Sequence, residues 1–437
     1  MSPIIIKGIQ LLLSLSLLVV LHELGHFIPA KLFKTRVEKF YLFFDVKFAL
    51  FKKKIGGTEY GIGWLPLGGY VKISGMIDES MDTEQMNLPP EPWEFRSKPA
   101  WQRLIIMLGG VTVNLILGFF IYMMINLVWG KDTLTSEAVP NGMDVTVLAE
   151  SVGFKDGDRI LKVDGEVLDN VYNLNKYLFL RSVSEVEVQH PSGVKETLQI
   201  PEDFGSQMFE SGDLRPVGIL FPAVIEVQPN SPAATSGLET GDLILSTNGV
   251  AINNYSFLVD HIKKEQYDTL HIELKRGNDQ IITKTVLPRE DGTIGIYPNS
   301  IEYTHVDLNL SESISAGFTY GYWTLHDYAA QFKYVFTEKG ASQVGGFAAI
   351  GSLFPAEWDW LGFWSSTALI SIILAFMNIL PIPALDGGHV MFLLYEMISG
   401  RKPNDRFMEY AQMFGFFLLL ALLLFANGND VYRVITG

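Results

Sequence analysis

IIIKGIQLLLSLSLLVVLHELGH, residues 4–26, joins an apolar run directly to three ionisable side chains. Lys7 is the one charge between Ile4 and Leu21. This run is close to the ~20 residues that a helix needs to cross the core of a bilayer. A secretory signal would end in a small-residue cleavage site, whereas this run continues straight into the ionisable residues. The stretch therefore predicts a retained membrane helix over residues 1–32.

The ionisable residues are His22, Glu23 and His26. Charged groups at membrane depth are costly and need a partner or a purpose. Side chains four residues apart share a helix face, so both imidazoles can hold one cation, and Glu23 beside them can accept a proton from a metal-bound water. The pattern H-E-x-x-H is the zinc motif of metalloproteases. The alternative, a helix with two surface histidines and a glutamate, fits poorly with the apolar setting.

A catalytic zinc ion usually has three protein ligands, and this motif supplies two. Because the chain has no cysteine, a carboxylate or another histidine must complete the set. Asp386 is the only acid between Asp359 and Glu396, in or near the third apolar block, and two prolines before it break the helix. Gly387-Gly388 allow a tight turn, which can direct Asp386 into a helix bundle. His389 is the alternative ligand, although a packed or capping role is favoured for it.

Asn378 and Asn114 fall inside apolar blocks. Asn378 can hydrogen-bond a substrate backbone or the oxyanion of a tetrahedral intermediate. The alternative for Asn378 is a helix–helix hydrogen bond, a common use of asparagine in membranes. For Asn114, which follows Gly109-Gly110, the packing role is favoured.

The composition of the chain agrees with a membrane protein. Its 437 residues include 33 Lys and Arg against 48 Asp and Glu, a net charge of −15, with 48% hydrophobic and only 19% charged residues. These values argue against a disordered chain and against a basic nucleic-acid binder, so no nucleic-acid partner is expected. The absence of cysteine excludes disulfides, thiolate nucleophiles, iron–sulfur clusters and Cys-ligated zinc. We therefore expect a lipid bilayer as the main environment.

Three further apolar blocks, about 104–129, 361–385 and 407–426, bring the expected membrane helices to four. Lys and Arg cluster in the segment between the first two helices, and again in the short connection between the last two. Such clusters mark the cytoplasmic side. Both termini and the long middle segment, about 130–360, are therefore expected outside the cytoplasm.

The middle segment contains a repeat with an offset of about 84 residues. GFKDGDRIL at 153–161 returns as GLETGDLIL at 237–245, and each copy is followed by an Asp-Gly or Asn-Gly turn. Both copies resemble PDZ domains, the second more fully because it has NSPAA at 230–234. PDZ folds bind extended chain ends by strand addition, so peptide chain ends are an expected partner of the second copy. The alternative is that both copies are spacers or size-exclusion walls.

Taken together, HELGH at 22–26, NILPIPALDGG at 378–388 and the tandem modules resemble the site-2 protease family of intramembrane zinc metalloproteases, in particular its bacterial members. The resemblance implies Zn²⁺ bound by His22, His26 and Asp386, with Glu23 as catalytic base or acid and Asn378 as a substrate-positioning residue. It implies cleavage of single-pass membrane proteins in the bacterial inner membrane, such as a trimmed anti-sigma factor or a remnant signal peptide. The exported modules would exclude substrates that still carry bulky domains.

The resemblance also implies a membrane-reentrant β-hairpin after the first helix, which fits the alternation at 39–51 and the Pro/Gly turn within 59–72. An edge strand there would clamp an unwound substrate, or else form only a cytoplasmic surface sheet. One departure is QVGGFAA at 343–349, where the family usually has Ser-Gly-Pro-Val-Gly. It concerns the exported entrance and not the expected zinc site.

The expected fold is a polytopic α-helical membrane protein with four transmembrane helices, a membrane-associated β-hairpin region and two exported PDZ-like α+β domains. The expected parts are 1–32, first helix; 33–100, cytoplasmic or reentrant β region; 101–130, second helix; 131–203 and 215–290, PDZ-like domains; 291–358, amphipathic linker; 359–390, third helix; and 391–437, cytoplasmic loop and fourth helix.

Two other functions compete with an intramembrane protease. A catalytically silent PDZ scaffold would not need Glu23, and a metal transporter would need more polar sites along its path.

Overall fold

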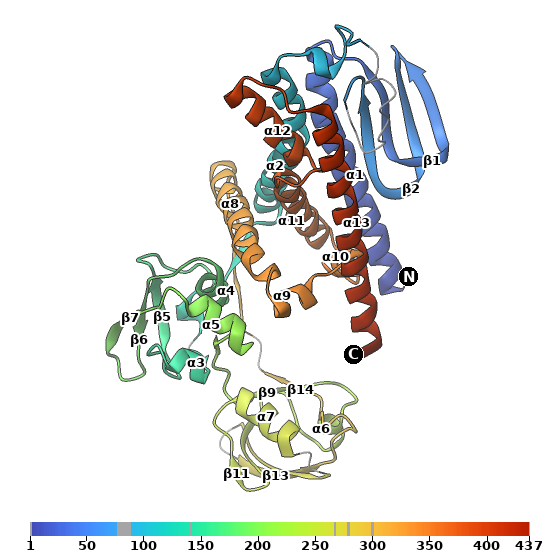
Figure 1. Ribbon diagram of the computed structural model, residues 1–437. Coiled ribbons are helices and arrows are strands. Elements are labelled where there is room, and N and C mark those ends of the chain that lie inside the picture. The colour runs from blue at the N-terminus through green and yellow to red at the C-terminus, as the bar shows by residue number, and fades with distance from the viewer. Residues whose placement is uncertain are drawn as a thin grey trace. The chain divides into compact units, whose positions relative to one another are not determined.

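The computed structural model describes residues 2–76, 89–139, 141–265, 268–277, 280–298 and 301–436. Part of the expected β region 33–100, residues 77–88, lies outside the described residues. The chain divides into two units, a mainly helical one formed by Met1–Gly130 and Asp307–Gly437, and a β-rich one formed by Lys131–Val306 (Figure 1).

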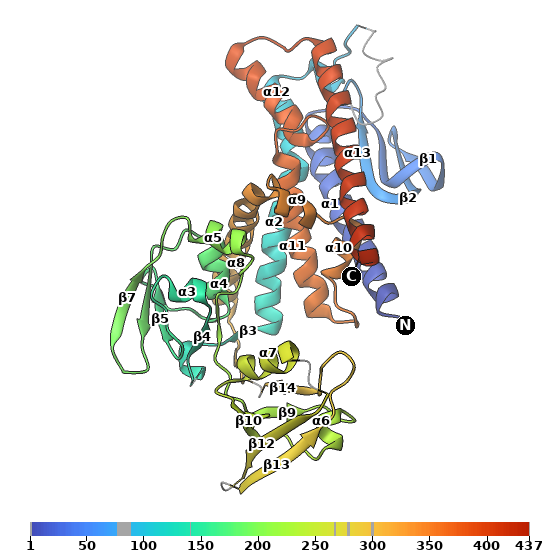
Figure 2. The same cartoon turned by 60° about the horizontal axis from the view of Figure 1, so that its bottom comes forward.

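Four helices of the first unit are long and apolar enough to cross a membrane. They are α1 (Pro3–Leu32), α2 (Ala100–Trp129), α11 (Trp360–Ile379) and α13 (Asp405–Thr436). In Figures 1 and 2 these helices run alongside one another, and the hairpin of β1 (Val37–Ile55) and β2 (Thr58–Ile73) lies beside α1. With the small antiparallel sheets of the second unit, they confirm the predicted fold class of a polytopic membrane protein with β domains.

The third apolar block differs from the expected single helix over 359–390. The helix α11 ends at Ile379, and a second helix, α12 (Asp386–Ser399), follows it. Between them lie Pro381 and Pro383, which lack the N–H that a continuous helix would need. The expected cytoplasmic loop after 391 is correspondingly shorter, because α12 continues to Ser399 and α13 begins at Asp405.

The helices α1 and α2 approach each other backbone to backbone. A Cβ atom on Gly25 of α1 would collide with the carbonyl of Gly109 on α2, and one on Gly109 would collide with the carbonyl of Gly25. Gly110 follows in the same contact, where a Cβ would meet the rings of His22 and His26. Small residues allow membrane helices to pack this closely, so the glycines bring α2 against the histidine face of α1.

The segment expected as an exported linker, 291–358, contains three helices of the first unit: α8 (Leu310–Val335), α9 (Glu338–Gln343) and α10 (Phe347–Ser352). The helix α8 begins with a capping box between Asn309 and Glu312 and packs its glycines on α2, with Gly317 against Met123. The glycine face of α8 is therefore covered by a membrane helix.

The stretch 343–349, which departs from the family pattern, is held by α13. Asp430 of α13 accepts hydrogen bonds from the backbone N–H groups of Gly346 and Ala348, both at 3.0 Å. Asn429 donates to the carbonyl of Val344 at 3.0 Å. The two bonds to Asp430 satisfy free N–H groups at the start of α10. A carboxylate from another helix therefore caps α10.

The hairpin forms a wider sheet than two strands suggest. Residues 37–42 of β1 pair on one side with 69–73 of β2 and on the other with 59–62, and 49–55 then pairs with 58–63. The two long strands thus bend into four adjacent segments, with 69–73 at one edge. This edge segment lies against α1, because a Cβ atom on Gly69 would lie 2.6 Å from Val19 Cγ1 and 3.7 Å from Glu23 Cγ.

The second unit contains two α+β modules, each with its own apolar core. The first comprises β3 (Lys131–Thr133), β4 (Met143–Val145), α3 (Val147–Glu150), β5 (Arg159–Val163), α4 (Asn173–Leu180), β6 (Glu185–Gln189), β7 (Lys195–Gln199), α5 (Phe204–Ser211) and β8 (Val217–Ile219). The second comprises β9 (Ile225–Val227), α6 (Pro232–Thr235), β10 (Leu243–Thr247), β11 (Val250–Ala251), α7 (Tyr255–Glu265), β12 (Leu270–Arg276), β13 (Gln280–Val286) and β14 (Ile296–Pro298), and β15 (Thr304–Val306) returns to pair with β3.

Both modules extend beyond their expected ends, 203 and 290. The strand β8 pairs with β4 in the first module, and β14 pairs with β9 in the second. Each pairing joins a strand near the start of a module to a strand near its end, and the two strands are far apart in sequence. Local patterns in the sequence do not report such pairs, so the expected boundaries stop one strand short.

The sequence repeat at 153–161 and 237–245 places one buried carboxylate at the same position in each module. Asp158 accepts from the N–H of Lys155 at 2.8 Å, and Asp242 accepts from the N–H of Glu239 at 2.9 Å. The cation that pairs with the carboxylate differs between copies. Arg276 binds Asp242 at 2.7 Å, whereas the first copy uses His190, whose Nδ1 lies 2.6 Å from Asp158 and whose Nε2 lies 2.8 Å from Glu196.

A methyl group at Gly109 should separate α1 from α2. We expect Gly109→Ala to lower the free energy of unfolding by about 1–3 kcal/mol, because the added carbon meets a backbone carbonyl that cannot rotate away. The control is Gly8→Ala on α1, where nothing lies within 4 Å of the added carbon. Thermal unfolding of the two purified variants measures the difference, and equal stability would contradict the close contact.

The first module should lose stability at alkaline pH. Hydrogen bonds to Glu196 and Asp158 raise the pKa of His190 above its ordinary value of 6.5. A raised pKa stabilises the fold fully below about pH 6.5, and this contribution is lost as the pH rises through the folded pKa. Hydrogen exchange of β6 in the full-length protein, corrected for intrinsic rates, should therefore accelerate between pH 6 and 9.

The second module supplies the control for that experiment, because Arg276 stays charged over this range. Exchange of β12 should not change, and His190→Arg should make β6 behave like β12. A β6 rate that is constant from pH 6 to 9 would contradict the stabilising role of the histidine cation.

Candidate functional site

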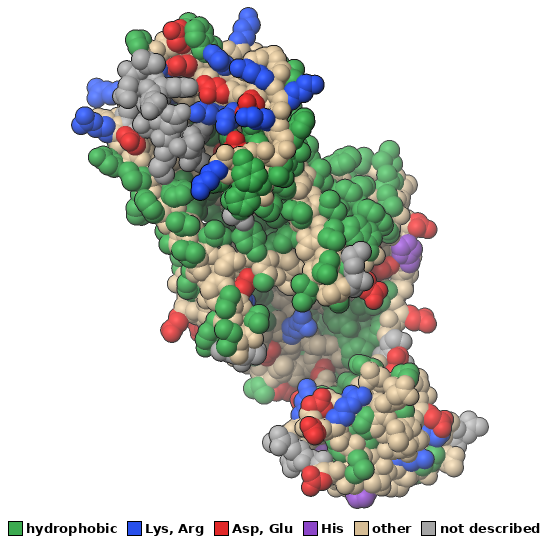
Figure 3. All heavy atoms as spheres, turned by 90° about the vertical axis from the view of Figure 1, so that its right-hand side faces the viewer, with side chains coloured by type: hydrophobic (Ala, Val, Ile, Leu, Met, Phe, Trp, Pro, Cys, Tyr) green, Lys and Arg blue, Asp and Glu red, His purple; other side chains and the backbone are tan. Residues whose placement is uncertain are grey.

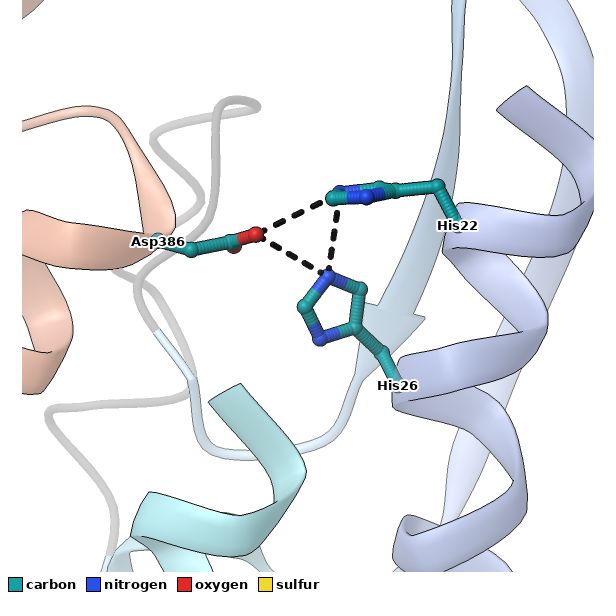
Figure 4. A group of neighbouring side chains, drawn as sticks. All are labelled: His22, His26 and Asp386. Atoms are coloured by element: carbon teal, nitrogen blue, oxygen red, sulfur yellow. Dashed lines mark hydrogen bonds and ion pairs between the residues drawn. The ribbon is translucent and has the colours of Figure 1, made fainter. Parts of the chain in front are cut away.

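Three side chains from opposite ends of the sequence meet inside the helical unit. His22 and His26 project from one face of α1, and Asp386 is the first residue of α12 (Figure 4). His22 Nε2, His26 Nε2 and Asp386 Oδ2 form a triangle with 3.3 Å between each pair of atoms. In the part of the chain that the structure describes, this is the one group of three such residues with metal-ligand spacing.

The loop before α12 sets the direction of Asp386. Ala384 has a left-handed backbone with a φ of 74°, which is uncommon for a residue with a Cβ atom. Its N–H donates to Gln412 Oε1 of α13 at 2.7 Å, and Gln412 is almost fully buried. The loop is therefore fixed by a hydrogen bond from the fourth membrane helix, which offsets part of the cost of its conformation.

Gly387 and Gly388 act differently from the expected tight turn. Both lie in the first turn of α12, and neither has a left-handed backbone. A Cβ atom on Gly388 would lie 2.6 Å from the carbonyl oxygen of Ile382, and one on Gly387 would collide with the carbonyl of Leu380. The glycines thus let α12 start directly against the loop that precedes it.

The three ligand atoms fit a zinc ion. Ligands about 2.0 Å from a tetrahedral ion lie about 3.3 Å apart, which is the spacing of this triangle. The donor set of two imidazole nitrogens and one carboxylate oxygen is a known catalytic zinc set that leaves a fourth position open. Asp386 Oδ2 is buried and lacks a hydrogen-bond donor among the described residues, as expected of an oxygen that faces a cation.

Each histidine is contacted by α2 at its other ring nitrogen. His26 Nδ1 lies 2.8 Å from the carbonyl oxygen of Ile106, which can only accept, so Nδ1 carries the proton and Nε2 presents a lone pair to the triangle. His22 Nδ1 lies 3.2 Å from the side-chain amide of Asn114. The sequence favoured helix packing for Asn114. The sequence did carry one sign of the contact between Asn114 and His22. Asn114 lies one helical turn after Gly110, and Gly110 packs against the two histidines of the H-E-x-x-H motif.

Glu23 lies at a cavity of about 680 Å³ that also contains the triangle. The other walls come from the edge segment of β2, from Phe347 and Ile350 of α10, and from the end of α11. The edge segment of β2 therefore forms one wall of the cavity, beside Glu23.

The remaining residues predicted from the sequence also line this cavity. Asn378, near the end of α11, lines it and has no hydrogen bond to its side chain among the described residues. His389 lines it too, but its Nε2 lies 3.0 Å from the amide nitrogen of Gln412, outside the triangle. The geometry thus groups Asp386, and not His389, with the two motif histidines.

The sequence is similar to known metalloproteases, in agreement with a metal site at this triangle. Residues 10–422 match peptidase family M50. The chain is 28% identical to the regulator of sigma E protease of Haemophilus influenzae and 28% identical to regulator of sigma-E protease RseP of Escherichia coli, in both cases over 97% of this chain and 98% of the relative. It is also 28% identical to a protein of Campylobacter jejuni named as a zinc metalloprotease, over 98% of this chain and 94% of the relative.

The family match covers both ends of the triangle as well as the tandem modules between them. It also includes all of α2 and most of α13. From its site and from this match, the chain belongs to peptidase family M50 and is a multi-pass membrane zinc metalloprotease.

Proposed function

We propose that the protein hydrolyses a peptide bond in the transmembrane segment of a single-pass membrane protein, with zinc held by His22, His26 and Asp386. The observation that carries the proposal is the triangle of ligand atoms on the wall of a cavity that also contains Glu23 and Asn378. A PDZ scaffold has no use for this arrangement, and a transporter would need a polar path beyond it.

In this proposal each residue has a separate role. Zinc bound at the triangle supplies Lewis acidity, which activates water and polarises the scissile carbonyl. Glu23 takes a proton from the attacking water and then delivers it to the leaving amine. Asn378 donates a hydrogen bond from its side-chain amide to the substrate backbone or to the developing oxyanion. The apolar helices around the cavity limit the access of bulk water to these groups.

The substrate must be extended at the cleavage position, because a helix hides its peptide bonds inside its own hydrogen bonds. The edge segment of β2, residues 69–73, lies beside Glu23 and offers a strand edge at the cavity. We propose that it pairs with the unwound substrate. Backbone hydrogen bonds are independent of side chains, so such pairing suits substrates with different sequences.

The proposed orientation places the site toward the cytoplasm of a bacterial inner membrane. Lys402, in the connection before α13, donates to the carbonyl of Arg96 at 3.1 Å, and Arg103 pairs with Glu396 at 2.5 Å. The basic segments expected on one side of the membrane therefore meet in the structure. Figure 3 shows Lys and Arg side chains gathered at one end of the helical unit, next to a largely hydrophobic surface. Basic ends of this kind favour the cytoplasmic side.

We propose that the exported modules restrict the substrates to proteins already trimmed outside the membrane. An anti-sigma factor is one such class, supported by the names of two relatives as regulators of sigma E, and a remnant signal peptide is another. A bulky exported domain would be excluded by size. Cleavage would then follow a first cut by another protease.

The strand edges of the two modules favour the second module for peptide ends. In the first module the side chain of Asn175 binds both backbone polar groups of Val217 on β8, at 2.6 and 3.1 Å. In the second, the carbonyl of Ile296 on β14 accepts one bond, from the hydroxyl of Tyr255 at 2.9 Å. A peptide that adds to β14 has to displace one hydrogen bond, whereas on β8 it has to displace two.

The role of Glu23 can be tested with Glu23→Gln. Loss of a general base should slow cleavage by about 10²–10⁴-fold, while the zinc content stays unchanged because Glu23 is not among the ligand atoms. The assay co-expresses a tagged, pre-trimmed single-pass substrate and follows its product by immunoblot.

The matched control is Glu357→Gln, an exposed glutamate of the same unit. It should cleave like the wild type. Equal product from Glu23→Gln would contradict the assigned base. Failure of the zinc-loaded wild type to cut any pre-trimmed single-pass protein would contradict the substrate class.

Binding of chain ends can be tested with a fluorescent peptide that has an apolar, free C-terminus. Tyr255→Phe should tighten its binding to the full-length protein about 5-fold, because one hydrogen bond of about 1 kcal/mol no longer has to be displaced. Tyr172→Phe, an exposed tyrosine of the first module, is the control. Equal binding of an amidated peptide, or no change on Tyr255→Phe, would favour the role of a size-exclusion wall.

A further inference from the structure

The side chain of Asn114 is fully buried in α2 against the metal-site histidines. Its amide nitrogen lies 3.2 Å from His22 Nδ1, and its Oδ1 has no hydrogen-bond partner among the described residues. Ser371 of α11 donates to the backbone oxygen of Asn114 at 2.7 Å, which fixes the position of this turn of α2. A buried amide oxygen without a donor is rare enough to require an explanation.

The proton on His22 depends on which atom of the amide faces it. If Asn114 donates from its nitrogen, His22 Nδ1 is an acceptor and the ring proton sits on Nε2. That proton would point at His26 Nε2 and Asp386 Oδ2, where a metal ligand needs a lone pair. The nitrogen and oxygen of an amide have nearly the same shape, and their assignment follows from the hydrogen bonds they make.

Exchange of the two amide atoms gives a consistent arrangement. Asn114 Oδ1 then accepts from His22 Nδ1–H, and the amide nitrogen takes the position that has no partner among the described residues, so the lone pair needed at His22 Nε2 decides between the two assignments. His22 Nε2 presents a lone pair to the triangle. His26 already has this tautomer, because the carbonyl of Ile106 can only accept. Both histidines are then held in the same state from one helix, with Ile106 and Asn114 two turns apart on α2.

We propose that Asn114 is a positioning residue for the zinc site, whose side-chain oxygen holds His22 in the tautomer that binds metal through Nε2. The inference rests on the proposed role of His22 as a ligand. Gly110, one turn earlier, completes the arrangement, since a Cβ there would lie 2.6 Å from His22 Cε1 and displace the ring. Partners of this kind usually change metal affinity by 10–100-fold.

The test measures the zinc affinity of the purified full-length protein by competition with a chelator, which is independent of cleavage. Asn114→Leu removes the acceptor at similar volume, and we expect its zinc affinity to fall about 10–100-fold. Asn114→Asp can only accept from Nδ1–H, and we expect it to stay within a few-fold of the wild type. Asn126→Leu, on the same helix, is the control, because Asn126 bonds only the carbonyl of Tyr122 among the described residues.

Each outcome separates this inference from the proposed ligand set. Wild-type zinc affinity in Asn114→Leu overturns the positioning role. An equal loss of zinc affinity in Asn114→Leu and Asn114→Asp also overturns it, because the amide nitrogen or packing alone would then matter. Zinc retained by His22→Ala overturns the ligand assignment itself. Rescue of affinity by Asp but not by Leu supports an acceptor at Nδ1–H, since a role in packing alone would not distinguish a carboxylate from an apolar side chain.

Discussion

Ionisable side chains within an apolar helix bundle require partners, and the arrangement of the helical unit follows from that requirement. The imidazoles of α1 and the carboxylate of α12 come from opposite ends of the sequence and are brought to a common spacing of 3.3 Å. Three features make this meeting possible: the backbone contact at Gly25 and Gly109, the interruption between α11 and α12, and the hydrogen bond from Ala384 to Gln412.

The bundle uses its helices for different tasks. The helix α1 supplies two candidate ligands and the candidate base, α12 supplies the third candidate ligand, and α2 contacts the other ring nitrogens of both imidazoles without entering the triangle. The fourth helix, α13, fixes loops at two places, through Gln412 before α12 and through Asp430 before α10. The candidate catalytic groups are thus a few side chains, while Gln412 and Asp430 fix the backbone of loops in the same unit.

Much of this site could be predicted from the sequence. The H-E-x-x-H spacing on an apolar helix identified His22, Glu23 and His26, and the lack of cysteine limited the third ligand to Asp386 or His389. Of those two, the sequence favoured Asp386, because the two prolines and Gly387-Gly388 can direct it into the bundle, and it favoured a packed or capping role for His389. The left-handed Ala384, the contact of Asn114 with His22 and the extra strands β8 and β14 were missed. They depend on contacts between segments far apart in the chain, and no local periodicity carries that information.

The bond between Gln412 and Ala384 ties the zinc site to the surrounding lipid. Large apolar side chains on α13, such as Phe414 and Leu424, are 67% exposed within the protein and face its surroundings. A helix of this kind adjusts its tilt when the thickness of the bilayer changes. Because Gln412 moves with α13, a change in tilt acts on the loop that directs Asp386. The direction of Asp386 therefore depends on the position of α13, although no candidate ligand of the described triangle lies on that helix.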